Sequence, residues 1–298
     1  MTKPHGWLVL NKPRGMTSTR AVSLVKRLFR GVKVGHGGTL DPLAEGVLPI
    51  ALGEATKTLS YVMDGIKTYA FSAVWGEQRS TDDAEGEVVA TSTKIPTLEE
   101  ILSAVSPFQG QILQTPPDYS ALWVDGKRAY DLAREGQEVT LAPRPVMVHA
   151  FEVTQTEAHQ AHFVATVGKG TYIRALVRDL AKALHTCAYA GYIRRTRVGR
   201  FDLSHALDAE NLASMTQDSV LSHIQPIEHV LDDIPAVVLE MPEAARLRNG
   251  QSVRPAITAA LSNATSDKGV LCLDCKGVPV ALATFAEGLL HPRRGFNF

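Results

Sequence analysis

The sequence of 298 residues is poor in cysteine and has no long apolar run. Three cysteines are too few for a disulfide framework in a chain of this length, and they favour a reducing compartment. No apolar run reaches the ~18 residues that span a bilayer. The apolar stretch that precedes Lys12 is too short for a signal peptide. We therefore expect a cytoplasmic protein without membrane contact.

The chain also lacks net charge, because 31 lysines and arginines balance 31 aspartates and glutamates. The charges are unevenly distributed, however. Residues 1–70 carry ten basic against four acidic side chains, and residues 160–200 carry eight against one. The two segments could form one positive face on a neutral protein, or they could be two solvated helix faces.

The signatures of nucleotide hydrolysis and of metal binding are missing. The glycine-rich stretch VGHGGTLDPLAEGVLP (34–49) has no lysine after a glycine and no G-x-G-x-x-G spacing, so it fits neither a Walker A loop nor a dinucleotide fingerprint. Cys272 and Cys275 form a single C-x-x-C without a second pair, whereas zinc requires four ligands. We predict neither a metal nor a cofactor.

Apolar periodicity predicts strands and helices without a regular βαβ rhythm. Period-two alternation or β-rich composition indicates strands, and spacing of three to four indicates helices. This mixture predicts an α+β fold, with a mixed, largely antiparallel sheet flanked by helices. Two prolines and short strand-like pieces near the end predict a boundary at residue 234, with domains 1–234 and 235–298. The predicted strands are 7–10, 67–75, 144–157 and 161–167, and the predicted helices are 17–31, 97–105 and 171–185.

Two residues in glycine-rich surroundings could be structural or functional. Asp41 precedes a proline and could cap a helix, yet the GHGG before it leaves room for another molecule to approach. Arg174 lies in the first turn of a helix that Thr171 is predicted to cap, where a cation opposes the helix dipole. This position predicts an acidic partner for Arg174, either Asp41 or a phosphate. Lys169 lies where an anion could also bind.

Six motifs in one order resemble the TruB family of tRNA pseudouridine synthases, over roughly residues 7–215. The motifs are LNKPRGMTS (10–18), KVGHGGTLDPLAEGVLPIALGEATK (33–57), KTYAF (67–71), TPPDYSALWVDGKRAYDLAREG (115–136), GKGTYIRALVRDL (168–180) and YIRRTRVGRF (192–201). The resemblance implies the pseudouridine synthase fold and, for the C-terminal tail, a small PUA-like domain. The segment at about 122–148 resembles a mobile insertion, or thumb, with Gly126 and Gly136 as hinges.

The resemblance implies isomerisation of the T-loop uridine at tRNA position 55. The uracil is detached from its ribose at N1, turned while bound, and rejoined through C5, without metal or cofactor. The catalytic aspartate falls on Asp41, which attacks C1′ or removes the C2′ proton; both routes stay open. Arg174 is implied to pair with Asp41, and Tyr69 to stack on the flipped base and assist proton removal from C5.

The resemblance also implies RNA-binding residues. His36 would hold the T-loop with its target nucleotide extruded, and Tyr172 and Ile193 would line the pocket. The glycines of 34–49 would then make room for that nucleotide. Basic side chains would neutralise the T-arm backbone: Lys12, Lys26, Arg27, Arg30, Lys169, Arg194, Arg195 and Arg197.

The chain departs from the family pattern in one loop, RSTDDAEG (79–86), of which only the second half matches. This departure leaves the role of residues 79–80 open, and we expect it not to affect the pocket. No extension resembles the partner-binding parts of the guide-RNA branch, so the expected partner is the tRNA T-arm without an obligatory protein. A rival hypothesis is an RNA-folding module, which would need the basic face but not Asp41. A synthase for another RNA would share the chemistry without the T-loop motifs.

Overall fold

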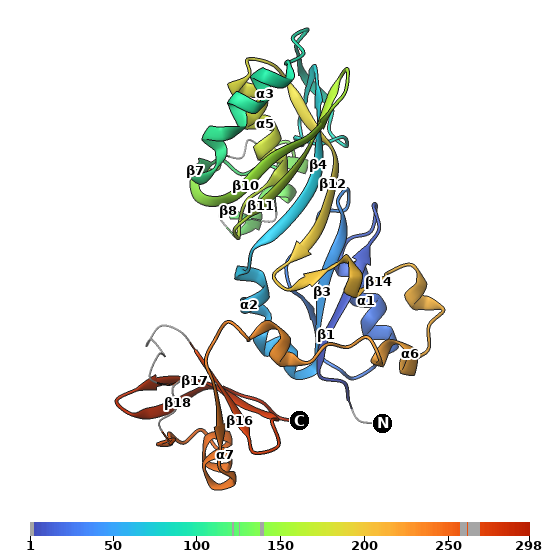
Figure 1. Ribbon diagram of the computed structural model, residues 1–298. Helices are drawn as coiled ribbons and strands as arrows, with labels where there is room; N and C mark the ends of the chain where they lie inside the picture. Colours follow the sequence, from blue (N-terminus) through green and yellow to red (C-terminus); the bar gives the residue numbers. More distant parts are fainter. Residues whose placement is uncertain (1–2, 121, 125, 138–139, 257–260, 262–268) are drawn as a thin grey trace.

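The computed structural model describes residues 3–120, 122–124, 126–137, 140–256, 261 and 269–298 (Figure 1). The largest sheet is a long mixed sheet of ten strands, with the strand order β14-β1-β3-β12-β4-β11-β10-β7 along its main path. β2 and β13 attach to β3 and β12. The strands are β1 Gly6–Lys12, β2 Val34–His36, β3 Glu45–Leu52, β4 Lys67–Trp75, β7 Gly110–Gln114, β10 Arg144–Thr156, β11 Gln160–Val167, β12 Ala188–Val198, β13 Phe201–Asp202 and β14 Ala206–Asp208.

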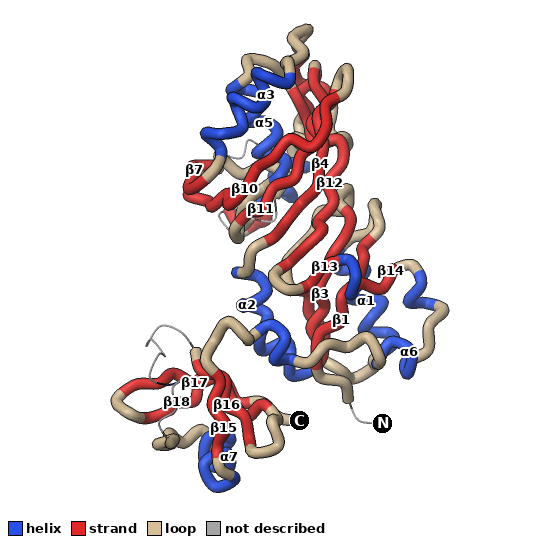
Figure 2. The backbone as a smooth tube through the Cα atoms, in the orientation of Figure 1, coloured by secondary structure: helices blue, strands red, loops and turns tan. Residues whose placement is uncertain are grey.

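The pairing confirms the predicted mixed, largely antiparallel sheet. Only β1–β14 and β12–β3 run parallel among these strand pairs. The helices and the remaining short strands surround the sheet (Figure 2). They are α1 Ser18–Leu28, η1 Gly53–Thr58, α2 Leu59–Asp64, β5 Glu77–Arg79, β6 Val88–Thr91, α3 Leu98–Val105, η2 Ser106–Phe108, β8 Trp123–Val124, β9 Lys127–Arg128, α4 Ala129–Arg134, α5 Ile173–Ala183, η3 Leu203–His205, η4 Asn211–Ala213, α6 Gln217–Leu221 and η5 Ile227–Val230.

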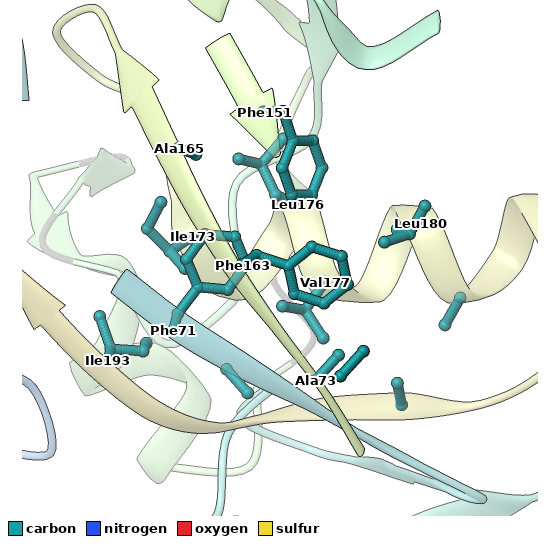
Figure 3. Close-up of a cluster of buried hydrophobic side chains, with 14 of the residues drawn as sticks. Phe71, Ala73, Phe151, Phe163, Ala165, Ile173, Leu176, Val177, Leu180 and Ile193 are labelled. Carbon is teal, nitrogen blue, oxygen red and sulfur yellow. The ribbon is translucent and has the colours of Figure 1, made fainter. Parts of the chain in front are cut away.

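The core beside the site forms where α5 packs on β4, β10 and β11 (Figure 3). Alternate β4 residues Phe71, Ala73 and Trp75 are buried on one face, as the period of two predicted. The apolar stripe of α5 faces them with Leu176, Val177 and Leu180. Tyr69 continues the β4 row and is only partly buried, so it extends from this core toward solvent.

A second core lies between α1 and strands β1 and β3. Thr17 caps α1 by accepting a hydrogen bond from the Arg20 amide, as predicted. Thr97 and Glu100 form the predicted capping box of α3. Part of the predicted insertion folds as β8, β9 and α4, whereas residues 121, 125, 138 and 139 are outside the described range.

A four-stranded sheet, β15-β16-β17-β18, forms a separate C-terminal domain. Its contact with the large sheet is specific: Phe296 is buried in the same cluster as Trp7, and Lys57 Nζ donates to the Gly295 carbonyl at 2.7 Å. The domain boundary at residue 234 stays a prediction. No helix in the described ranges is both long and apolar enough to cross a bilayer. The elements are β15 Ala236–Leu239, α7 Met241–Arg248, β16 Val270–Asp274, β17 Pro279–Ala286 and β18 Leu289–Gly295.

Candidate active site

Asp41 lies in a turn that leads directly into β3. Its carbonyl accepts a hydrogen bond from the Ala44 amide at 3.1 Å, and β3 begins at the next residue, Glu45. Of the two alternatives for Asp41, a helix beginning at Pro42 is therefore not present, because too few residues separate Asp41 from the strand. The Asp41 side chain does not cap a helix, and it remains 42% exposed at the pocket described below.

Arg174 extends from the first turn of α5 to Asp41. Arg174 Nη2 lies 2.9 Å from Asp41 Oδ2, which confirms that Arg174 has an acidic partner. The guanidinium also donates to the carbonyls of Thr81 and Tyr119, each at 2.9 Å, and its Nη1 lies 3.5 Å from Asp83 Oδ2. The Arg174 side chain is only 5% exposed. A buried guanidinium held by four groups thus fixes the orientation of an exposed carboxylate.

A side chain from strand β7 holds the backbone at the N-terminus of α5 by hydrogen bonds. Tyr172, not Thr171, is the N-cap residue, and the Thr171 hydroxyl donates back to the Gly168 carbonyl. The predicted Thr171 cap is therefore wrong. Gln114 at the end of β7 replaces it: its Oε1 accepts from the Tyr172 amide at 2.8 Å, and its Nε2 donates to the Tyr172 carbonyl at 3.2 Å. Arg144 lies 5.4 Å from the centre of the Tyr172 ring, which is a cation–π distance.

One pocket of about 390 Å³ brings the predicted residues together. Asp41 and Arg174 line it together with Gly38, with aromatic and apolar side chains and with further basic ones. This volume is within the range of small-ligand sites and accommodates a single nucleotide. The lining includes the predicted Tyr69, Tyr172 and Ile193, together with Lys67 and Arg144, which sequence reasoning missed.

A second pocket of about 510 Å³ adjoins the first, because Asp41 and Arg174 line both. His36 lines this second pocket beside Thr17 at the N-terminus of α1. Burial, followed by the nearby charge of Arg195, lowers the pKa of His36, so the imidazole is neutral at pH 7. His36 therefore offers a neutral ring near the ion pair.

The glycines of 34–49 serve internal packing more than an incoming nucleotide. A Cβ at Gly37 would lie 2.6 Å from Val62, and one at Gly46 would lie 2.2 Å from the Arg195 carbonyl. The expectation that these glycines make room for RNA is wrong for both positions. Gly38 does line the pocket, with φ of +123°.

Lys12 and Arg195 are buried, and their contact with RNA stays a prediction. Arg195 donates to the carbonyls of Gly38, Thr39 and Val47 at 2.8–3.1 Å, and Lys12 donates to those of Met16, Pro13 and Pro42 at 2.6–3.3 Å. The two side chains hold the turn on either side of Asp41. Burial lowers the pKa of Lys12 to about 8, despite the opposing attraction of Asp41.

Arg197 does not face the pocket that Ile193 and Arg195 line. A bulge between Arg195 and Arg197 reverses the alternation of β12, and Arg197 lines a separate cleft with Thr68 and Arg200. Lys169 pairs with Asp64 at 3.1 Å, and Arg194 with Glu45 at 3.7 Å. Lys26 and Arg27 at the end of α1, and Arg30 just after it, are exposed to solvent. Contact of these six predicted residues, Arg197 included, with RNA stays a prediction.

Loop 79–86 contributes more to the site than the sequence suggested. The Thr81 carbonyl and the Asp83 carboxylate, which lie beyond residues 79–80, contact Arg174. The two adjacent aspartates in TDDAEG were the feature of the sequence that could have indicated this contribution. Across the described ranges, no group of three or more His, Cys, Asp or Glu side chains is placed to hold a metal ion.

Comparison with known proteins agrees with this geometry. The family model described as TruB family pseudouridylate synthase (N terminal domain) matches residues 26–173. Proteins named tRNA pseudouridine synthase B are 47% identical in Nitrobacter winogradskyi and in Bradyrhizobium diazoefficiens, over 98% of this chain and 83% and 86% of theirs. The protein of that name in Caulobacter sp. (strain K31) is 45% identical over 98% of this chain and 96% of its own.

Solved structures share the fold. The archaeal box H/ACA sRNP Nop10-Cbf5 complex contains a chain with a TM-score of 0.74 at 22% identity, covering 98% of this chain and 86% of that one. An H/ACA RNP bound to a substrate RNA containing 2′-deoxyuridine gives 0.73 at 23% identity, covering 99% and 86%. With near-half identity to the curated relatives over almost its whole length, and with Asp41 and Arg174 paired in a nucleotide-sized pocket, the chain belongs to the TruB family of pseudouridine synthases.

Proposed function

We propose that the protein isomerises the T-loop uridine at position 55 of tRNA to pseudouridine in the cytoplasm. The Asp41–Arg174 ion pair at the wall of the pocket supports this proposal most directly. The N1–C1′ bond of the uridine breaks, a C5–C1′ bond forms, the C5 proton leaves and N1 gains a proton. The reaction is balanced without an oxidant or a second substrate.

Asp41 supplies the negative charge at the ribose. Attack on C1′ and removal of the C2′ proton both require an ionised carboxylate within reach of the sugar. Arg174 meets this need, because its guanidinium is already desolvated and held by the carbonyls of Thr81 and Tyr119. The carboxylate can therefore react without first reorganising its partner.

Tyr69 and Ile193 provide the surface for the detached uracil. Tyr69 is half-buried against the core and Ile193 is buried, and both line the pocket with Asp41. An aromatic ring can stack on the base while it turns, and the phenol oxygen can accept the C5 proton. The target base must leave its loop to reach this pocket, which is the reason for base flipping.

The decisive experiment uses an unmodified T-arm hairpin and the purified protein with a chelator. The RNA is digested and its nucleosides are separated by chromatography, because uridine and pseudouridine have the same mass. We expect pseudouridine at one T-loop site. A requirement for metal or nucleotide, or conversion outside the T-loop, would contradict the proposal. Fractionation of cells with an antibody to the protein tests the compartment.

A further inference from the structure

Arg178 lies one helical turn beyond Arg174 on α5 and makes a parallel set of contacts. Its Nη1 donates to Asp82 Oδ2 at 2.9 Å, its Nη2 to the Thr115 carbonyl at 2.7 Å, and its Nε to Asp179 Oδ1 at 2.8 Å. The side chain is 11% exposed. Residues four apart on a helix share a face, so both guanidiniums reach the loops 79–86 and 115–120.

Asp82 is the residue that connects the two arginines. It lies between Thr81 and Asp83, both of which contact Arg174, while its own carboxylate contacts Arg178. Its φ of +57° is rare for a residue other than glycine, so its surroundings must hold it there. The Asp82 carbonyl accepts a hydrogen bond from the Ala190 amide at 3.0 Å, which ties the loop to β12 independently of Arg178.

The charges around Asp82 are closely balanced. Asp82 is buried, and burial raises its pKa to about 6 in spite of Arg178, so the carboxylate is ionised at neutral pH. The charged groups that face it are Arg178, then Arg174, and the acidic Asp179. A buried charge whose partner is removed seeks another partner, because leaving it unpaired is costly. Without Arg178, the cation that still acts on the Asp82 carboxylate among the groups named above is Arg174.

We infer that Arg178 is a positioning residue for the reaction: by neutralising Asp82, it leaves Arg174 free to pair with Asp41. Arg178 does not line the pocket that holds Asp41 and Tyr69, and it acts through Arg174. The inference rests on the proposed function, since turnover is its readout. It also separates the two acids of the loop, because Asp83 shares Arg174 with Asp41 whereas Asp82 is kept away from it.

The test compares Arg178→Met with the double variant Asp82→Asn/Arg178→Met. Single-turnover rates are measured by tritium release from a T-arm hairpin labelled at C5 of uridine, with enzyme in excess, and hairpin Kd is measured separately. In Arg178→Met, Asp82 competes for Arg174, so we expect the rate to fall at least about tenfold with Kd nearly unchanged. In the double variant the unpaired charge is gone, so the rate returns to within about threefold of the original protein.

Two further variants act as controls. Arg178→Lys keeps a cation beside Asp82, so it is faster than Arg178→Met. Asp179→Asn removes the more exposed partner of Arg178 and leaves the rate unchanged.

Several outcomes would overturn the inference. One is an Arg178→Met protein that reacts at the original rate. Another is a double variant that is as slow as Arg178→Met, which would mean that Arg178 serves the packing of α5. If Arg178→Met does not fold, the rate of the double variant is compared with that of the original protein. A rate within about threefold supports the inference, and a rate at least about tenfold lower contradicts it. Inactivity of the unaltered protein would instead contradict the proposed function.

Discussion

Arg174 is buried and Asp41 is half-exposed, and Arg174 Nη2 lies 2.9 Å from Asp41 Oδ2. The two residues are more than a hundred positions apart in the sequence. The asymmetry gives each residue a separate task. The guanidinium is fixed by backbone carbonyls inside the protein, whereas the carboxylate faces the pocket. The arginine therefore holds the carboxylate in one orientation without occupying the space of the substrate.

Asp41→Asn tests the role of this carboxylate. The amide is similar in size but carries no charge, so it neither attacks C1′ nor removes a proton. We expect kcat to fall by about four orders of magnitude, with hairpin Kd and Tm close to those of the original protein. If hairpin binding were lost along with activity, Asp41 would be a structural residue.

Tyr69→Phe separates stacking from proton transfer. The phenylalanine ring can still stack on the base but cannot accept the C5 proton, so we expect binding to persist and kcat to fall by about a hundredfold or more. Tyr69→Leu should weaken both, because it also removes the aromatic surface. Single-turnover tritium release and hairpin Kd distinguish the two effects. Equal activity of Tyr69→Phe and the original protein would exclude a role for the phenol.

The exposed basic residues at and just beyond the C-terminus of α1 are tested through salt dependence. Replacing Lys26, Arg27 and Arg30 together by glutamine should reduce the slope of log K against log[salt] by about 2, at roughly 0.7–0.9 per lost phosphate contact. The slope is measured by hairpin binding between low and moderate salt. Arg246→Gln, an exposed arginine on α7, is the control and should leave the slope intact. An unchanged slope in the triple variant would place the RNA elsewhere.

Gln114→Leu tests the cross-strand cap of α5. The variant removes both hydrogen bonds to the Tyr172 backbone inside the protein, so we expect a loss of about 1–3 kcal/mol in the free energy of unfolding. Gln111→Leu, an exposed position on the same strand, should change it little. Urea denaturation measures both. Similar stabilities of the two variants would show that the cap contributes nothing.

Because Lys67 is buried, we expect the free energy of unfolding to rise at alkaline pH. Burial, followed by the nearby charge of Arg195, lowers its pKa from 10.5 to about 8, so above pH 8 the folded chain releases a proton that the unfolded chain keeps. The free energy of unfolding therefore gains from Lys67 as pH rises from about 8 to 10.5. Lys67→Met should show a smaller rise, with the remainder due to Lys12.

The measurement is urea denaturation across this pH range, with Lys169→Met as the exposed control. A full rise in Lys67→Met would show that Lys67 is not the titrating group.

The repetitive parts of the fold could be predicted from sequence, because burial of one face repeats along a strand or helix. Tyr69 and Phe71 on β4, and the apolar stripe of α5, are examples. Local signals were less reliable. Asp41–Pro42 resembles a helix start, but the strand that follows so soon prevents one, and Gln114 from a distant strand replaces the expected cap by Thr171.

The roles of charged residues were hardest to predict. Lys12 and Arg195 appear as solvent-facing cations in sequence, but carbonyl groups from distant segments satisfy them inside the protein. The bulge that turns Arg197 away from the pocket interrupts the alternation of β12, and no repeating pattern in the sequence indicates it. The contribution of Asp83 also depends on a contact that only the folded chain makes.

The place of β12 in the sheet has a consequence for how activity arises during synthesis. Among the described strands, β3 and β4 do not pair directly, and β12 lies between them. Asp41 precedes β3, whereas Tyr69 and Arg174 belong to the β4 side. A nascent chain that ends before Ala188 thus contains every proposed catalytic side chain but lacks the strand that joins the two halves. Catalytic activity should therefore appear in one late step, when β12 inserts between β3 and β4.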